Sequence, residues 1–147
     1  MKYDKYHIET SSSFLKFEFV SKGPNGDIRK QVIFRQTDHA DVFNLGFGDV
    51  DHNTGQINDI TITNNNDSQK VLATVALTVL RFFEKNPDKY VFATGSTKSR
   101  TRLYKMGISS NLEEIKENFE VFGFDGIKWE AFRKERDYDA FLIRKIS

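Results

Sequence analysis

The sequence contains no cysteine and no long run of apolar residues. Without cysteine there can be no disulfide, no thiolate zinc site and no cysteine nucleophile. The most apolar stretch, residues 71–83, is interrupted by Thr74, Thr78 and Arg81, so it is too short and too polar to span a bilayer. The first residues, MKYDKYHIETSSSF, lack the apolar segment of a signal peptide. We therefore expect a cytoplasmic protein with no membrane partner.

The sequence also lacks a charge excess, because 22 Lys and Arg balance 21 Asp and Glu to a net charge of +1. Nucleic-acid coat proteins owe much of their affinity to neutralised phosphates, so this balance disfavours that class while allowing a local basic patch. The 147 residues match the usual size of one domain, and no repeat or low-complexity linker divides them. We therefore expect a single domain over residues 1–147.

The first half of the chain has the patterns of an antiparallel β-meander. Residues 14–20 and 28–34 are β-rich and flank the turn formers of residues 23–27, which predicts a β-hairpin. Residues 42–48 place Phe43, Leu45 and Phe47 on one face of a third strand. Residues 57–63, with Ile60 and Ile62, are expected to form a fourth strand.

The second half begins with a long helix. Apolar residues from Val71 to Phe83 form one helical stripe after the capping residues 64–68, and Asn86-Pro87 ends it. Residues 90–93 predict a central strand covered on both faces. Short helices are expected over 99–106, ended by Gly107, and over 111–118. Strands follow over 119–124, 127–132 and 138–143, with turns or bulges at Gly123 and Gly126. The fold class is therefore α+β, and the many Phe residues predict a well-filled core rather than stacking platforms for bases.

One stretch, residues 94–107, carries suggestive chemistry because basic and hydroxyl side chains meet between a strand and a helix. Free N–H groups and the helix dipole attract anions at such a turn, glycine allows close approach, and arginine can bind phosphate or carboxylate with two hydrogen bonds. The spacing matches neither the Walker loop nor G-x-G-x-x-G. We expect a pocket for a small anionic, phosphate-bearing ligand, with these candidate residues: Thr94, Gly95, Ser96, Thr97, Arg100 and Arg102.

The alternative interpretation of the same stretch is a solvated surface helix capped by Ser96 or Thr97. Arg100, Arg102 and Tyr104 lie two residues apart, so they cannot all share one helical face. At least one of them must point into the protein, and a buried arginine needs a partner or a ligand.

Two other patterns carry little weight. Residues 49–55 resemble a calcium loop, but glycine is one place late and Ile60 stands where the bidentate Glu belongs. The three histidines have no partner at metal spacing. We expect no metal site.

Residues 59–107 contain several segments that together resemble a family of small bacterial proteins, about 150 residues long, of unknown function. The segments are Thr63-Asn64-Asn65, Asp67, Lys70–Val75, Ala93–Thr97 and Arg100–Tyr104. The resemblance extends over nearly the whole chain and implies one folded unit, but it brings no activity with it.

The order of elements is also similar to the N-acetyltransferase (GNAT) superfamily, and Tyr104 and Gly107 match its Tyr-x-x-Gly-aromatic helix end. That resemblance implies acetyl-coenzyme A as cofactor, Tyr104 as general acid and a splayed pair of central strands. The glycine-rich turn that grips coenzyme A is missing, because Asn64–Ser68 stand there. Anion binding at residues 94–105 is therefore the leading hypothesis. An acyltransferase and a protein-interaction module of a two-gene bacterial system, which implies a protein partner, are the alternatives.

Overall fold

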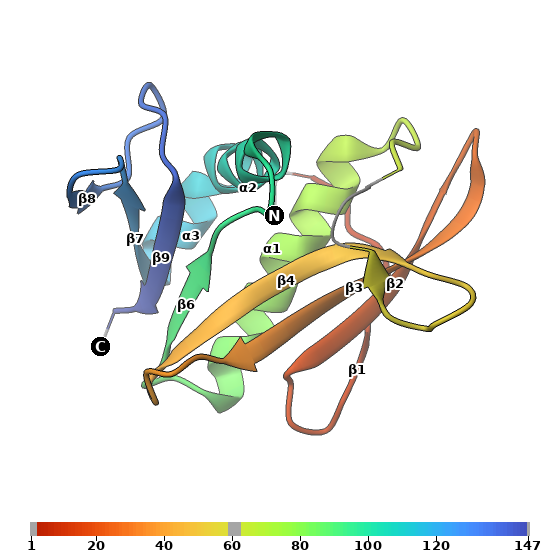
Figure 1. Ribbon diagram of the computed structural model, residues 1–147, viewed down its shortest axis with the longest axis horizontal. Helices are drawn as coiled ribbons and strands as arrows, with labels where there is room; N and C mark the ends of the chain where they lie inside the picture. Colours follow the sequence, from red (N-terminus) through yellow and green to blue (C-terminus); the bar gives the residue numbers. More distant parts are fainter. Residues whose placement is uncertain (1–2, 59–62, 147) are drawn as a thin grey trace.

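The computed structural model describes residues 3–58 and 63–146. It has the predicted α+β fold, with a mixed nine-stranded sheet in the order β1-β2-β3-β4-β6-β9-β7-β8, and β5 beside β4 (Figure 1). The strands are β1 (Glu9–Thr10), β2 (Lys16–Gly23), β3 (Gly26–Gln36), β4 (Val42–Val50), β5 (Ile57–Asn58), β6 (Tyr90–Ala93), β7 (Phe119–Phe124), β8 (Trp129–Ala131) and β9 (Ala140–Lys145). The helices are α1 (Ser68–Lys85), α2 (Lys98–Ser110) and α3 (Leu112–Asn118).

Strands β2, β3 and β4 form the predicted antiparallel meander. The hairpin between β2 and β3 closes through Pro24-Asn25, within the predicted cluster of turn formers. Alternate residues of β4, including Phe43, Leu45 and Phe47, are buried as the period-two pattern predicted. Of the predicted fourth strand, Ile57–Asn58 pairs with β4 as β5, while Ile60 and Ile62 lie outside the described residues.

The long helix predicted from the apolar stripe is α1. Of the stripe, Ala76 and Leu80 are half-buried and the other residues are buried, together with Ala73, Thr74, Thr78 and Phe82. The helix ends at Lys85, before Asn86-Pro87. All fourteen Phe residues lie in the described part of the chain. Ten of them are buried in the core, as expected, whereas Phe14, Phe92, Phe122 and Phe124 are half-buried. Phe82, for example, packs 4.5 Å from Phe34 and 5.2 Å from Phe43, measured between ring centroids.

Strand β6 is central, between β4 and β9, but it is not buried on both faces. Val91 and Ala93 are buried beneath the helices, whereas Tyr90 and Phe92 are only half-buried. This difference arises because α1 and α3 cover one face of the sheet, and the opposite face carries no helix among the described residues. The apolar residues of Tyr90–Ala93 therefore lie in two different surroundings: Val91 and Ala93 in the core, and Tyr90 and Phe92 on the face without helices.

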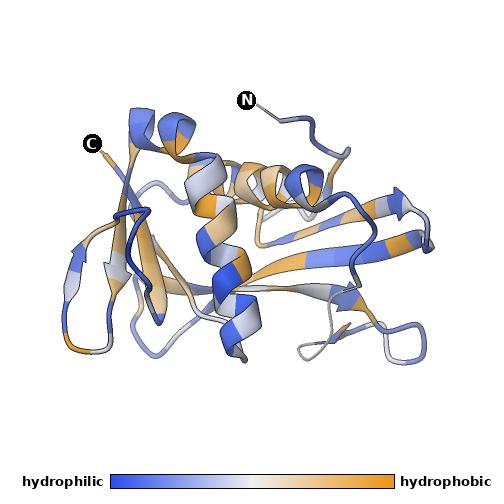
Figure 2. Ribbon diagram, turned by 90° about the horizontal axis from the view of Figure 1, so that it is seen from above, coloured by the Kyte–Doolittle hydropathy of each residue, from blue (hydrophilic) through white to orange (hydrophobic). Residues whose placement is uncertain are grey.

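Strands β4 and β6 run parallel, and they separate soon after they meet. Their register covers only Val42–Asn44 against Tyr90–Phe92, although β4 continues to Val50. Figure 1 shows the two strands diverging toward the upper edge of the sheet. Helix α2 crosses this edge, and Figure 2 shows it running across the direction of α1. Its N-terminal end therefore reaches the side of the sheet opposite α1.

Helix α2 is longer than predicted, because Gly107 does not stop it. It continues to Ser110, and the added Cβ of a residue at 107 would lie 3.4 Å from the Leu72 side chain of α1. Gly107 thus lies inside α2, where the helix packs against Leu72, and not at its end. Gly123 was wrongly assigned to a turn or bulge: it lies within β7, where a Cβ would collide with the ring of Tyr138. Gly126 does occupy a turn, with φ of 99°.

Candidate functional site

The predicted ligand-binding stretch lines an open cleft of about 480 Å³ at the upper edge of the sheet. One wall is the turn after β6 with the first turns of α2, and the other is the segment that leads into β9. Five of the six predicted ligand-binding residues line it: Thr94, Gly95, Ser96, Thr97 and Arg102. The remaining lining residues are Lys98, Thr101, Lys105, Asp137, Tyr138 and Asp139.

Hydroxyl groups hold the turn against α2. Thr97 is the N-cap, since its side chain accepts a hydrogen bond from the backbone N–H of Arg100 at 3.2 Å. Thr101 Oγ1 accepts from the N–H of Gly95 at 3.0 Å and donates to the carbonyl of Thr97 at 3.2 Å. Helix α2 therefore begins at the predicted cap, and its first turn is tied back to the preceding loop.

Gly95 is required by packing. A Cβ at this position would lie 2.4 Å from the backbone nitrogen of Thr101 and 2.6 Å from the Cβ of Arg100. Distances this short exclude any side chain unless the backbone shifts. The glycine therefore brings the loop against α2, which shapes the cleft.

Three cationic side chains, Lys98, Arg102 and Lys105, lie on the cleft face of α2. Their spacing of four and three residues places them on one side of the helix. Neither Lys98 nor Arg102 forms an ion pair within the described residues, and no acidic residue stands in the first turn of α2. Cations near a helix N-terminus oppose the helix dipole, so this arrangement costs stability unless an anion is bound.

The opposite wall is acidic and comes from a distant part of the chain. Asp137 forms an ion pair with Lys105 at 3.1 Å. The backbone carbonyl of Asp139 accepts a hydrogen bond from Thr94 Oγ1 at 2.8 Å. The hydroxyl of Tyr138 donates to Glu130 at 2.7 Å. Burial of the ring, followed by this hydrogen bond, raises the pKa of Tyr138 above its usual value.

Arg100 is the exception among the predicted ligand-binding residues, because it does not line the cleft. Its side chain is 5% exposed and points toward β4 and β5, where its guanidinium donates to the carbonyl of Asn58 at 3.4 Å. Arg100 and Arg102 lie on opposite sides of α2, as residues two apart on a helix must. The expectation that one residue of the Arg100, Arg102 and Tyr104 set points inward is thus confirmed, and Arg102 is the cleft residue.

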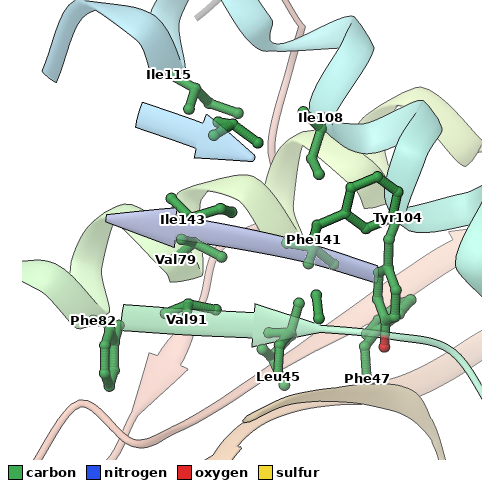
Figure 3. Close-up of a cluster of buried hydrophobic side chains, with 14 of the residues drawn as sticks. Leu45, Phe47, Val79, Phe82, Val91, Tyr104, Ile108, Ile115, Phe141 and Ile143 are labelled. Carbon is green, nitrogen blue, oxygen red and sulfur yellow. The ribbon is translucent and has the colours of Figure 1, made fainter. Parts of the chain in front are cut away.

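Tyr104 also lies on the inner side of α2 and is 8% exposed. Figure 3 shows its ring within the core, close to Phe47 and Leu45 of β4. Together with Ala93 and Ile108 it lines a small apolar cavity of about 50 Å³. Tyr104 therefore fills the gap that opens where β4 and β6 separate.

Residues 49–55, the stretch that resembles a calcium loop, form a turn. Asp51 Oδ1 accepts hydrogen bonds from the backbone N–H groups of Asn53 and Thr54, at 2.7 and 3.2 Å. The carboxylate of Asp49 is held by Lys30 and by the N–H of Thr63. The carboxylates of Asp49 and Asp51 therefore stabilise the turn and its surroundings.

Comparison with known proteins adds the family. A sequence model of the family of unknown function DUF6934 matches residues 2–146. The protein belongs to this family. No curated protein and no solved structure matches the chain. The DUF6934 assignment agrees with the family resemblance in residues 59–107, whereas the acetyltransferase resemblance gains no support from these comparisons.

Six of the eleven residues that line the cleft of this DUF6934 protein were not among the predicted ligand-binding residues. The positions of Lys98 and Lys105 could have been inferred from their helical spacing with Arg102. Asp137, Tyr138 and Asp139 could not, because only the sheet brings β9 beside β6.

None of the helices in the described residues combines the length and the apolar character needed to cross a membrane.

Proposed function

We propose that the protein is a binding domain that holds a small anionic, phosphate-bearing ligand in the cleft beside α2. The observation that carries this proposal is the pair Lys98 and Arg102, which share a cleft and lack an ion-pair partner within the described residues. Arginine offers phosphate two parallel hydrogen bonds, and lysine adds a mobile positive charge.

The shape and charge of the cleft support a ligand of limited size. Lys105 is already neutralised by Asp137, so the net positive charge lies toward the N-terminal end of α2. The hydroxyl-bearing residues Thr94, Ser96, Thr97 and Thr101 surround that end. A ligand phosphate beside Lys98 and Arg102 would also relieve the unfavourable interaction of these cations with the helix dipole.

Calorimetry with inorganic phosphate and ribose 5-phosphate tests the proposal on the full chain. Arg102→Ala and Lys98→Ala are each expected to weaken binding by about tenfold, since each removes a charge-assisted hydrogen bond. Lys116→Ala on α3 is the matched control, because it removes an exposed cation that does not line the cleft. No binding of either probe, or equal binding by Arg102→Ala, would refute the anion site.

The acyltransferase alternative is favoured by one observation, the parallel pair β4 and β6 that separates after three residues. In this proposal acetyl-coenzyme A is the cofactor and Tyr104, at the separation, is the general acid. Two features oppose it: Tyr104 is embedded in the core, and Asp67 stands before α1, where a pyrophosphate would have to lie. Calorimetry that detects no acetyl-coenzyme A binding would remove this alternative.

We propose a cytoplasmic location for this binding activity. The chain has no cysteine, which is the composition expected where disulfides do not form. Fractionation of cells that carry a tagged copy tests the location, and recovery in the membrane or extracellular fraction would contradict it.

A further inference from the structure

The aromatic hairpin next to the cleft carries two exposed large hydrophobic side chains close together. Four large hydrophobic side chains are exposed in the described residues, namely Met106, Ile127, Trp129 and Ile146. Two of them, Ile127 and Trp129, belong to the hairpin of β7 and β8. Ile127 is 89% exposed at its tip, and Trp129 is 43% exposed on β8.

The Trp129 ring lies across the open face of the sheet. Its centroid is 5.2 Å from that of Phe124 on β7 and 6.2 Å from that of Phe92 on β6. Because β9 and β7 separate β6 from β8, a ring on β8 can reach Phe92 only by lying over these strands. Phe92 and Phe124 thus support the indole, and the part of Trp129 that they leave exposed offers aromatic surface to a ligand.

Asp139 joins this aromatic cluster to the cleft. Its backbone N–H donates to the carbonyl of Phe124 at 2.7 Å, and its own carbonyl accepts the hydrogen bond from Thr94. Its carboxylate faces the turn of the hairpin, since a Cβ on Gly126 would lie 3.0 Å from Asp139 Oδ2. In Figure 2 the hairpin turn and the N-terminal end of α2 project to the same side of the sheet.

We propose that the ligand of the cleft is a 5′-nucleotide, with its phosphate on Lys98 and Arg102, its ribose at Asp139 and its base on Trp129. This inference rests on the proposed anion site and adds the chemical class of the ligand. Asp139 lines the cleft with Lys98 and Arg102 and also contacts the hairpin that carries Trp129, so its carboxylate lies between the cations and the aromatic ring. A nucleotide carries the matching order: phosphate, ribose hydroxyls that donate to a carboxylate, and a base that stacks.

The acidic wall fixes the orientation of the nucleotide. Asp137 and Asp139 repel a phosphate, so only the α2 side of the cleft accepts that group. The same chemistry is present in a free mononucleotide and in the 5′-phosphorylated end of a single-stranded nucleic acid. Both sources therefore enter the test as separate ligands.

Trp129 is the single tryptophan of the sequence, so its fluorescence reports directly on the base site. The full chain is titrated with AMP, ribose 5-phosphate and inorganic phosphate, by fluorescence and by calorimetry. We expect AMP to quench Trp129 and to bind about tenfold more tightly than ribose 5-phosphate, because stacking on an aromatic side chain contributes this much. Ribose 5-phosphate is expected to bind without quenching.

Variants separate the three subsites. Trp129→Leu is expected to lower AMP affinity to that of ribose 5-phosphate and to leave ribose 5-phosphate binding unchanged, while Trp129→Phe retains most of the AMP affinity. Asp139→Asn is expected to weaken AMP and ribose 5-phosphate about threefold but not inorganic phosphate. Ile146→Ala removes another exposed apolar side chain and serves as the control. Circular dichroism establishes that each variant folds, and the wild-type comparison of AMP with ribose 5-phosphate needs no variant.

The outcomes distinguish this inference from the proposed function. If AMP binds no more tightly than ribose 5-phosphate, Trp129 serves another purpose, such as docking a protein, and the nucleotide inference is wrong while the anion site stands. If no phosphate-bearing probe binds, both are wrong. A 5′-phosphorylated oligonucleotide that binds more tightly than AMP identifies single-stranded nucleic acid as the source, and weaker binding identifies the mononucleotide; either supports the nucleotide site.

Discussion

At the start of α1 the residue before the helix is Asp67, whereas at the start of α2 it is Thr97, followed by Lys98. Asp67 Oδ2 accepts hydrogen bonds from Ser21 at 2.5 Å and from Tyr6 at 2.6 Å. A carboxylate beside the positive end of the helix dipole is stabilising. The chain therefore supplies its own anion at α1.

The start of α2 lacks such an internal anion. Neither helix has an acidic residue in its first turn, but the residue before α2 is Thr97 rather than an aspartate, and the cations Lys98 and Arg102 face an open cleft. The contrast indicates that the charges at the start of α1 stabilise the fold. Those at the start of α2 destabilise it slightly and leave a place for an external anion. Each of the following changes tests one side of this contrast.

Removal of the internal anion at α1 should have the largest effect. Asp67→Ala leaves the hydroxyls of Ser21 and Tyr6 without their acceptor and the helix without its charge, so we expect a loss of about 2–3 kcal/mol in the free energy of unfolding. Asp67→Asn retains an acceptor and should lose only about 1 kcal/mol. Urea denaturation measures both. A loss below about 0.5 kcal/mol for Asp67→Ala would show that Asp67 is not the internal anion of α1.

Loss of the cap of α2 should have a smaller effect. Thr97→Ala removes the hydrogen bond to the N–H of Arg100 and should cost about 1 kcal/mol in the free energy of unfolding. Thr97→Ser keeps the hydroxyl and is the matched control. Because Thr97 also lines the cleft, calorimetry with ribose 5-phosphate on both variants shows whether capping and binding depend on the same hydroxyl.

Reversal of the charge at the start of α2 should change the sign of the stability effect. Lys98→Glu places a carboxylate at the positive end of the helix, so the free energy of unfolding should rise by about 0.5 kcal/mol. The same change should abolish phosphate binding. Lys98→Gln, which only removes the charge, should give a smaller stabilisation. If Lys98→Glu lowers stability, the cations of α2 are not in conflict with the dipole.

Much of the fold could be predicted from local patterns. The stripe from Val71 to Phe83 identified α1, and alternation identified the meander, because both elements bury one continuous face. The errors occurred where a tertiary contact decides the role of a residue. Gly107 was predicted to stop a helix, yet it lies within α2 where the helix packs against Leu72, and Tyr90–Ala93 was predicted to be buried on both faces.

The candidate site was predictable only in the part that is continuous in sequence. Thr94 to Arg102 could be recognised as a basic, hydroxyl-rich turn between a strand and a helix. Helical spacing showed that Arg100 and Arg102 diverge, but not which of them faces the cleft. Asp139 and Trp129 gave no signal, because only long-range pairing in the sheet places β9 beside β6 and β8 beside β7.

The smallest effect concerns two tyrosines, one at each region. Burial, followed by a hydrogen bond to a carboxylate, raises the pKa of Tyr6 and of Tyr138 above the usual 10.0, with Asp67 and Glu130 as the respective partners. Because the folded state holds these protons more tightly than the unfolded state, their contribution to stability is complete below pH 10.0 and is lost as the pH rises through the folded-state pKa.

Urea denaturation from about pH 9 to about pH 11 should therefore show stability falling with pH. Tyr6→Phe and Tyr138→Phe should each make that fall shallower. Tyr6→Phe could instead lose stability with pH as steeply as the wild type while Tyr138→Phe does not. In that case Asp67 does not hold the proton of Tyr6, and Asp67 is not the internal anion of α1.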